Sequence, residues 1–186
     1  EAPTLRPDGS VLEVEGYDAE TGLLVDFGGV EFAPVPLTPS QLDAARALEE
    51  LTELVKGFPF VEETDRSAAV AAILTALVRN SIPTAPLFGF TAPKPRSGKS
   101  LLADIPALLS TGHRPSTVTF SGDPAEERKR LMGLLQGGDT VVLFDNLSAP
   151  IGGDALCTIL TQAAWTTGCS AGTTPARRPR SRPRRR

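Results

Sequence analysis

The chain has 186 residues, of which 40% are hydrophobic, an ordinary content for one compact domain with a short extension. No apolar run approaches the roughly 20 residues that cross a bilayer, and residues 1–10 lack the apolar region of a signal peptide, so we expect a cytoplasmic protein with no membrane partner. Because residue 1 is Glu rather than Met, we expect the chain to be part of a longer protein.

The formal net charge of −3 hides an uneven distribution of charge along the chain. Seven of the 19 basic residues are arginines within 177–186, whereas all 22 acidic residues precede that segment. A purely basic end on an acidic chain indicates either a nucleic-acid-binding arm or a segment foreign to the fold. The two cysteines, Cys157 and Cys169, and the single histidine, His113, match no metal-ligand spacing, and we expect both thiols to be reduced and buried.

Residues 1–37 form a β-rich lead-in segment in the sequence pattern. Alternating apolar residues, with turn residues between Asp18 and Gly22, predict a short β-meander over 10–32. The Pro34-Val35-Pro36 run that follows is a stiff connector.

Residues 38–85 form a helical segment. A Ser-containing start at residue 40 and apolar residues at helical spacing predict an amphipathic helix over 41–56. A second, mostly apolar helix is predicted over about 65–79, and we expect both helices to pack against the domain that follows.

Strands alternate with helices between residues 86 and 165. Apolar runs predict strands at 87–90, 117–120 and 141–144, and helical patterns cover 100–109, 124–135 and 153–164. Strands separated by helices of this length indicate βαβ units, so we expect an α/β fold with a mainly parallel sheet.

The loop after the first expected strand matches a phosphate-binding loop. It reads Pro93-Lys94-Pro95-Arg96-Ser97-Gly98-Lys99-Ser100 and fits G-x-x-x-x-G-K-[ST] everywhere except at Pro93, which replaces the first glycine. A strand before the loop and a helix after it would let backbone amides converge on the phosphates of ATP. Lys99 would contact the β- and γ-phosphates, Ser100 would ligate Mg²⁺, and Gly98 would allow close backbone approach. The competing interpretation is a solvated turn in which Lys99 is an ordinary surface lysine.

A second candidate magnesium residue ends the third expected strand. Asp145 follows the apolar run 141–144, at the position where P-loop NTPases carry a carboxylate that lies beside the magnesium ion. The stretch of chain between Lys99 and Asp145 is long enough for one further strand and helix. Many hydrolysing members place a glutamate next, whereas Asn146 stands here and cannot accept a proton as a carboxylate does. Asn146 would orient water instead, so Lys99, Asp145 and Asn146 are the candidate catalytic residues.

The general base that would act on the attacking water could also come from the helix over 124–135. Glu126 and Glu127 are the candidates there. The alternative interpretation is that they belong to a solvated charged face together with Arg128, Lys129 and Arg130.

A family resemblance rests on four motifs between residues 91 and 146 and on three segments upstream of them. The motifs are 91–93, 97–104, 126–130 and 142–146, and the upstream segments are 6–10, 16–18 and 21–23. In this combination the chain resembles the helicase-like P-loop ATPase domains of phage, prophage and plasmid replication proteins, some of which are fused to a primase-polymerase domain. The similarity covers about residues 4–165, and Arg96 departs from it because a small residue is expected there.

The resemblance implies a three-layer P-loop NTPase core over 86–165 that performs ATP-dependent work on DNA during replication of a mobile element. It also implies a homo-oligomer in which a neighbouring subunit contributes an arginine to the nucleotide. After Trp165 the group continues with a further strand, but this chain does not. We therefore expect the core to lack its C-terminal part. Residues 166–186 are then a disordered basic tail, either read out of frame or a native DNA-binding arm.

Two further functions stay open from the sequence. One is a nucleotide-binding switch or loader module with little or no turnover, which Asn146 permits. The other is a small-molecule kinase that uses the same loop, although no acceptor pocket is evident in the sequence.

Overall fold

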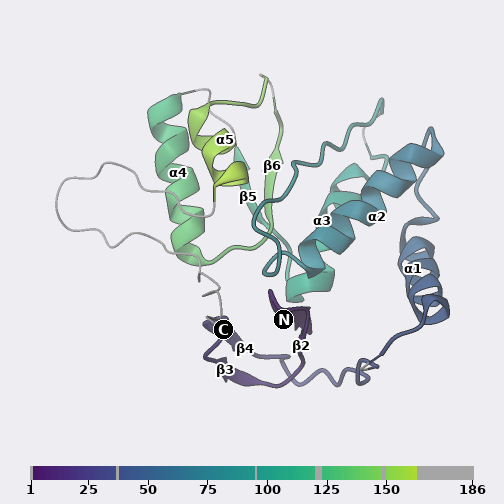
Figure 1. The fold of residues 1–186 in the computed structure, drawn as a ribbon. Helices are drawn as coiled ribbons and strands as arrows, with labels where there is room; N and C mark the ends of the chain where they lie inside the picture. Colours follow the sequence, from purple (N-terminus) through teal and green to yellow (C-terminus); the bar gives the residue numbers. More distant parts are fainter. Residues whose placement is uncertain (1, 37, 95, 120–122, 148–149, 163–186) are drawn as a thin grey trace.

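The computed structural model describes residues 2–36, 38–94, 96–119, 123–147 and 150–162, and these form a mixed α/β protein (Figure 1). The strands are β1 (Thr4–Leu5), β2 (Val11–Leu12), β3 (Gly16–Asp18), β4 (Leu23–Val25), β5 (Ser116–Thr119) and β6 (Val142–Asp145). The helices are α1 (Gln41–Val55), α2 (Glu63–Leu77), α3 (Lys99–Thr111), α4 (Pro124–Gly137) and α5 (Asp154–Thr161). Within the described residues the chain therefore contains both helices and strands, as expected for an α/β protein.

The lead-in segment folds as two small antiparallel sheets rather than as one meander. β1 pairs with β2, and β3 pairs with β4 through a turn that the Gly22 N–H closes onto the Asp18 carbonyl at 2.7 Å. The lead-in is joined to the helices by the Thr4 hydroxyl, which donates to the Leu77 carbonyl at 2.8 Å, and by the Ala2 N–H, which donates to Ser110. Its position is thus set by the C-terminal ends of α2 and α3.

α1 begins after Ser40, as predicted, and its start is a capping box. The Ser40 hydroxyl accepts from the Asp43 N–H at 3.2 Å, and the Asp43 carboxylate accepts from the Ser40 N–H at 2.9 Å. The helix contacts α2 mainly through its C-terminal end, where Val55 is fully buried. α2 packs against α3 of the domain that follows, as expected, whereas α1 packs on α2 and leaves Leu42 and Leu48 59% and 47% exposed.

A hydrophobic core lies between the C-terminal end of α1, the middle of α2 and one face of α3. Val55, Val70 and Ile73 are its buried centre. Partly buried side chains complete it: Leu51, Phe58, Phe60, Leu77, Leu102, Ile105 and Leu109. Because α2 packs along α3, this core fixes the helix that begins at Lys99.

β5, α4 and β6 form one βαβ unit with a parallel strand pair. The register places Ser116 opposite Val142 and Thr119 opposite Asp145. Asp123 caps α4 by accepting from the Ala125 N–H at 3.0 Å. In Figure 1, α4 and α5 lie on one side of this strand pair, and α2 and α3 lie on the other.

The strand expected at 87–90 does not form. These residues are described but belong to no strand, and among the described residues β5 and β6 pair only with each other. A strand needs a neighbour to supply its ladder hydrogen bonds, and the apolar run 87–90 has none there. The expected mainly parallel sheet is therefore limited to two strands in this part of the chain.

α3 runs through Pro106 without a break, although a proline inside a helix removes a backbone donor. Within the described ranges, no helix is both long and apolar enough to span a bilayer. Trp165 and the basic tail expected at 166–186 lie outside the described residues.

Candidate functional site

The N-terminus of α3 is built by Gly98, which takes the left-handed backbone conformation at φ 85°. Glycine adopts this conformation at no steric cost, and it lets the loop turn directly into the helix. The Gly98 carbonyl accepts the first helical bond, from the Leu102 N–H at 2.9 Å. The N–H groups of Lys99, Ser100 and Leu101 have no acceptor within the helix, and no side chain in the described part of the chain caps them, so they are available to an anion.

A hollow of about 460 Å³ lies at this helix end and is formed by the loop itself. Its lining residues are Ala92, Pro93, Lys94, Arg96, Ser97, Gly98, Lys99, Ser100 and Leu101. The sequence motif predicted a binding loop at 93–100, and in the structure the two flanking residues, Ala92 and Leu101, also line the hollow. Pro95 lies outside the described residues.

The described lining of the hollow is positively charged. It includes Lys94, Arg96 and Lys99 and contains no acidic residue. None of these three takes part in an ion pair within the described residues. The helix dipole adds further positive potential at the same point, so the hollow favours an anionic ligand.

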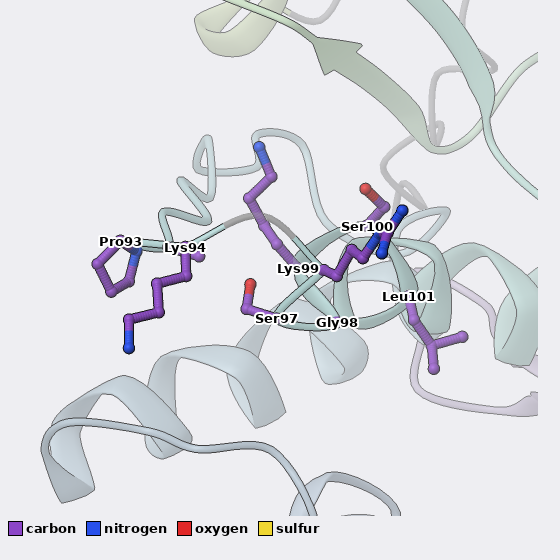
Figure 2. A pocket seen from close by; sticks show the side chains of 9 residues that line it. Pro93, Lys94, Ser97, Gly98, Lys99, Ser100 and Leu101 are labelled. Carbon is purple, nitrogen blue, oxygen red and sulfur yellow. The ribbon is translucent and has the colours of Figure 1, made fainter.

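Lys99 and Ser100 present their polar groups together. Figure 2 shows the Lys99 amine and the Ser100 hydroxyl on the same side of the loop, whereas Lys94 extends the other way. Both residues are exposed to solvent. An ammonium and a hydroxyl placed this way can bind a phosphate and donate an oxygen ligand to a hard cation.

Arg96 occupies an unusual backbone position in the loop. Its φ of 60° lies in the left-handed region, which non-glycine residues adopt at a cost of about 1 kcal/mol or more. The resemblance led us to expect a small residue here, and among small residues only glycine would remove this backbone cost. The guanidinium nevertheless lines the hollow and adds to its charge.

Asp145 and Asn146 lie at the carboxyl end of β6 and do not line this hollow. Asn146 also takes a left-handed conformation, at φ 53°, and its N–H donates to Asp145 Oδ1 at 2.8 Å. Asparagine tolerates this conformation better than most residues. Asn146 therefore has a conformational role as a turn residue, which sequence reasoning overlooked although Asn after a strand is a recognised turn signal.

The glutamates of α4 differ in their surroundings. Glu126 is exposed and accepts from Lys129 Nζ at 2.9 Å, and this contact raises the pKa of Lys129. This arrangement favours the solvated charged face for Glu126, since its carboxylate is engaged by a neighbour one turn away. Glu127 is only partly exposed.

Cys157 lies on α5 and is exposed, contrary to the expectation of a buried thiol, and Cys169 lies outside the described residues. No group of three or more His, Cys, Asp or Glu side chains gathers into a metal site within the ranges that the structure describes.

Comparison with protein-family models, with curated proteins and with solved structures finds no match to this chain.

Proposed function

We propose that the chain binds ATP and Mg²⁺ at the N-terminus of α3 through residues 93–100. The observation that carries this proposal is the hollow at Gly98, where three basic residues line the loop beside the first-turn amides of α3, with no acidic residue among the described lining. A polyphosphate is the common cellular ligand that uses all of these groups at once.

Within this proposal the residues divide the work by their chemistry. The amides of Lys99, Ser100 and Leu101 donate to phosphate oxygens, and the Lys99 ammonium neutralises their charge. Ser100 and Asp145 offer hydroxyl and carboxylate oxygens, which are the ligands that Mg²⁺ prefers. Because Mg²⁺ keeps several waters, Asp145 could act through one of them from the end of β6. A bound Mg²⁺ would supply charge neutralisation at the phosphates.

The test is the affinity for ATP-Mg of the Lys99→Ala variant. Loss of one charge-assisted hydrogen bond removes about 2 kcal/mol, so we expect roughly 30-fold weaker binding by calorimetry. Lys129→Ala is the matched control, because it removes an exposed lysine whose partner is Glu126, away from the hollow. Equal affinities of the wild-type protein and Lys99→Ala would remove the site assignment.

The wider proposal is that binding supports ATP hydrolysis by a helicase-like ATPase that acts on DNA during replication of a mobile element. It is supported by the resemblance of the motifs at 91–93, 97–104, 126–130 and 142–146, and that resemblance further suggests a homo-oligomer. ATP turnover that rises on addition of single-stranded DNA would support it. Turnover that does not respond to single- or double-stranded DNA would contradict it.

One observation favours a second function, a nucleotide-binding switch with little turnover. Neither Asp145 nor Asn146 lines the described hollow, so the candidate catalytic groups are not assembled beside the loop. If the switch is correct, ATP-Mg binds while phosphate release stays at the background rate, both with and without DNA.

A further inference from the structure

The backbone of the phosphate loop rests on an aromatic ring from a distant part of the chain. A Cβ placed on Gly98 would lie 3.2 Å from Phe58 Cε1 and 3.5 Å from Phe58 Cδ1, and no other atom of the described residues outside the immediate chain neighbours comes within 4 Å. Phe58 belongs to the turn that follows α1, whereas Gly98 opens α3. The ring therefore occupies the space beside the residue that turns the loop into the helix.

Phe58 is itself held in place from several directions. Its N–H donates to the Val55 carbonyl at 3.1 Å, and its carbonyl accepts from the Phe60 N–H at 2.9 Å. Its ring pairs with that of Phe60 at a centroid distance of 6.4 Å and packs against the buried cluster of Val55, Val70 and Ile73. A ring fixed in this way is a firm support rather than a mobile surface group.

Gly98 needs such a support because it has no side chain of its own to restrict it. Glycine samples both signs of φ with similar ease, so a free Gly98 would spread over several backbone conformations. In the structure Gly98 holds the left-handed conformation at the start of α3, where Lys99, Ser100 and Leu101 line the hollow. Restriction by a neighbouring ring would lower the entropy lost when a ligand orders the loop.

We propose that Phe58 is a positioning residue for the anion-binding loop, which acts by holding the Gly98 backbone against the helical core. The role rests on the proposed nucleotide binding, because Phe58 contributes no polar group to the ligand. It gives the α1–α2 segment a function beyond scaffolding, since the affinity of the loop then depends on packing in that segment.

The chain provides a matched control for this proposal. Phe60 belongs to the same core and to the same ring pair, yet it has no atom within 4 Å of the Gly98 Cβ position. Phe58→Ala and Phe60→Ala remove the same volume, so both are expected to lower the melting temperature. Only Phe58→Ala should weaken ATP-Mg binding, by about ten-fold. Phe58→Leu retains apolar bulk beside Gly98 and should recover part of that loss.

These affinities are measured by calorimetry on the full chain, at a temperature where thermal unfolding shows every variant to be folded. Equal affinities of Phe58→Ala and Phe60→Ala, whether both reduced or both normal, would overturn the positioning role. Wild-type protein that binds no nucleotide would instead overturn the proposed function.

A second measurement decides the role of Phe58 without any ligand. The Leu102 N–H donates to the Gly98 carbonyl, so its hydrogen exchange reports on the conformation of Gly98. In the ligand-free protein, NMR should show faster exchange of this amide in Phe58→Ala than in Phe60→Ala. Identical exchange at Leu102 in the two variants would contradict the proposal, whatever the outcome of the binding experiment.

Discussion

The guanidinium of Arg6 engages both carboxylate oxygens of Asp18, with Nη2 2.9 Å from Oδ1 and Nε 3.3 Å from each oxygen. Arg6 follows β1 and Asp18 ends β3, so this ion pair joins the two small sheets of the lead-in. The Thr21 hydroxyl and N–H also donate to Asp18 Oδ2. Led by the Arg6 contact, these donors lower the pKa of Asp18 to about 2.

Acid should therefore loosen the lead-in at an unusually low pH. A carboxylate whose pKa is lower in the folded state contributes stability that is fully present above its unfolded pKa and is lost as the pH falls through its folded pKa. For Asp18 this window runs from 3.8 down to about 2. NMR shifts of the Thr21 amide should show a midpoint near the lower value in wild type and nearer 3.8 in Arg6→Ala. The same low midpoint in both proteins would show that Arg6 does not hold the carboxylate.

Asp145→Ala should abolish the effect of Mg²⁺ on ATP binding while leaving binding without Mg²⁺ unchanged. The reason is that Asp145 is proposed to act on the cation and not on the phosphates. Calorimetric titrations with and without Mg²⁺ measure the difference, expected to be about ten-fold in the wild-type protein. Asp139→Asn, which changes an exposed carboxylate before β6, is the control and should retain the Mg²⁺ effect. A full Mg²⁺ effect in Asp145→Ala would leave Asp145 as a strand-end residue only.

Arg96→Gly should stabilise the protein and weaken ATP binding at the same time. Glycine relieves the left-handed backbone at φ 60°, which we expect to raise the free energy of unfolding by about 1 kcal/mol in urea denaturation. It also removes one of three basic side chains from the hollow. Arg96→Ala removes the same charge but retains the unfavourable φ, so it should weaken binding without stabilising the fold. Equal stabilities of the two variants would contradict the conformational argument.

Substitutions at Asn146 should separate its conformational role from a chemical one. Asn146→Gly suits the left-handed φ of 53° and should retain stability, whereas Asn146→Ala should cost about 1 kcal/mol. If Asn146 also orients water for hydrolysis, both variants lose turnover, because neither carries a polar side chain. Phosphate release and urea denaturation of the two variants provide the comparison. Full turnover in Asn146→Gly would leave only the turn role.

Features that depend on neighbouring residues could be predicted from the sequence. The start of α1 follows from Ser40 and Asp43, and the start of α4 from Asp123 and Pro124, because helix caps are made by side chains within one turn. The loop 93–100 and the helix that begins at Lys99 also followed from a local pattern, as did the turn between β3 and β4. The short reach of these interactions allows a linear sequence to specify them.

Contacts between distant residues were decided only by the tertiary structure. The run 87–90 has the apolar character of a strand, but no neighbouring strand supplies hydrogen bonds to it within the described residues. α1 has an amphipathic pattern, yet Leu42 and Leu48 stay largely exposed, whereas Leu51 and Val55 nearer its C-terminal end join the core. The support of Gly98 by Phe58 joins residues from separate helical segments, and no local pattern indicates it. Ladder pairing and side-chain packing depend on which surfaces meet in space, so the sequence determined the helix starts and the loop, while the fold decided which strands form and what holds the elements in place.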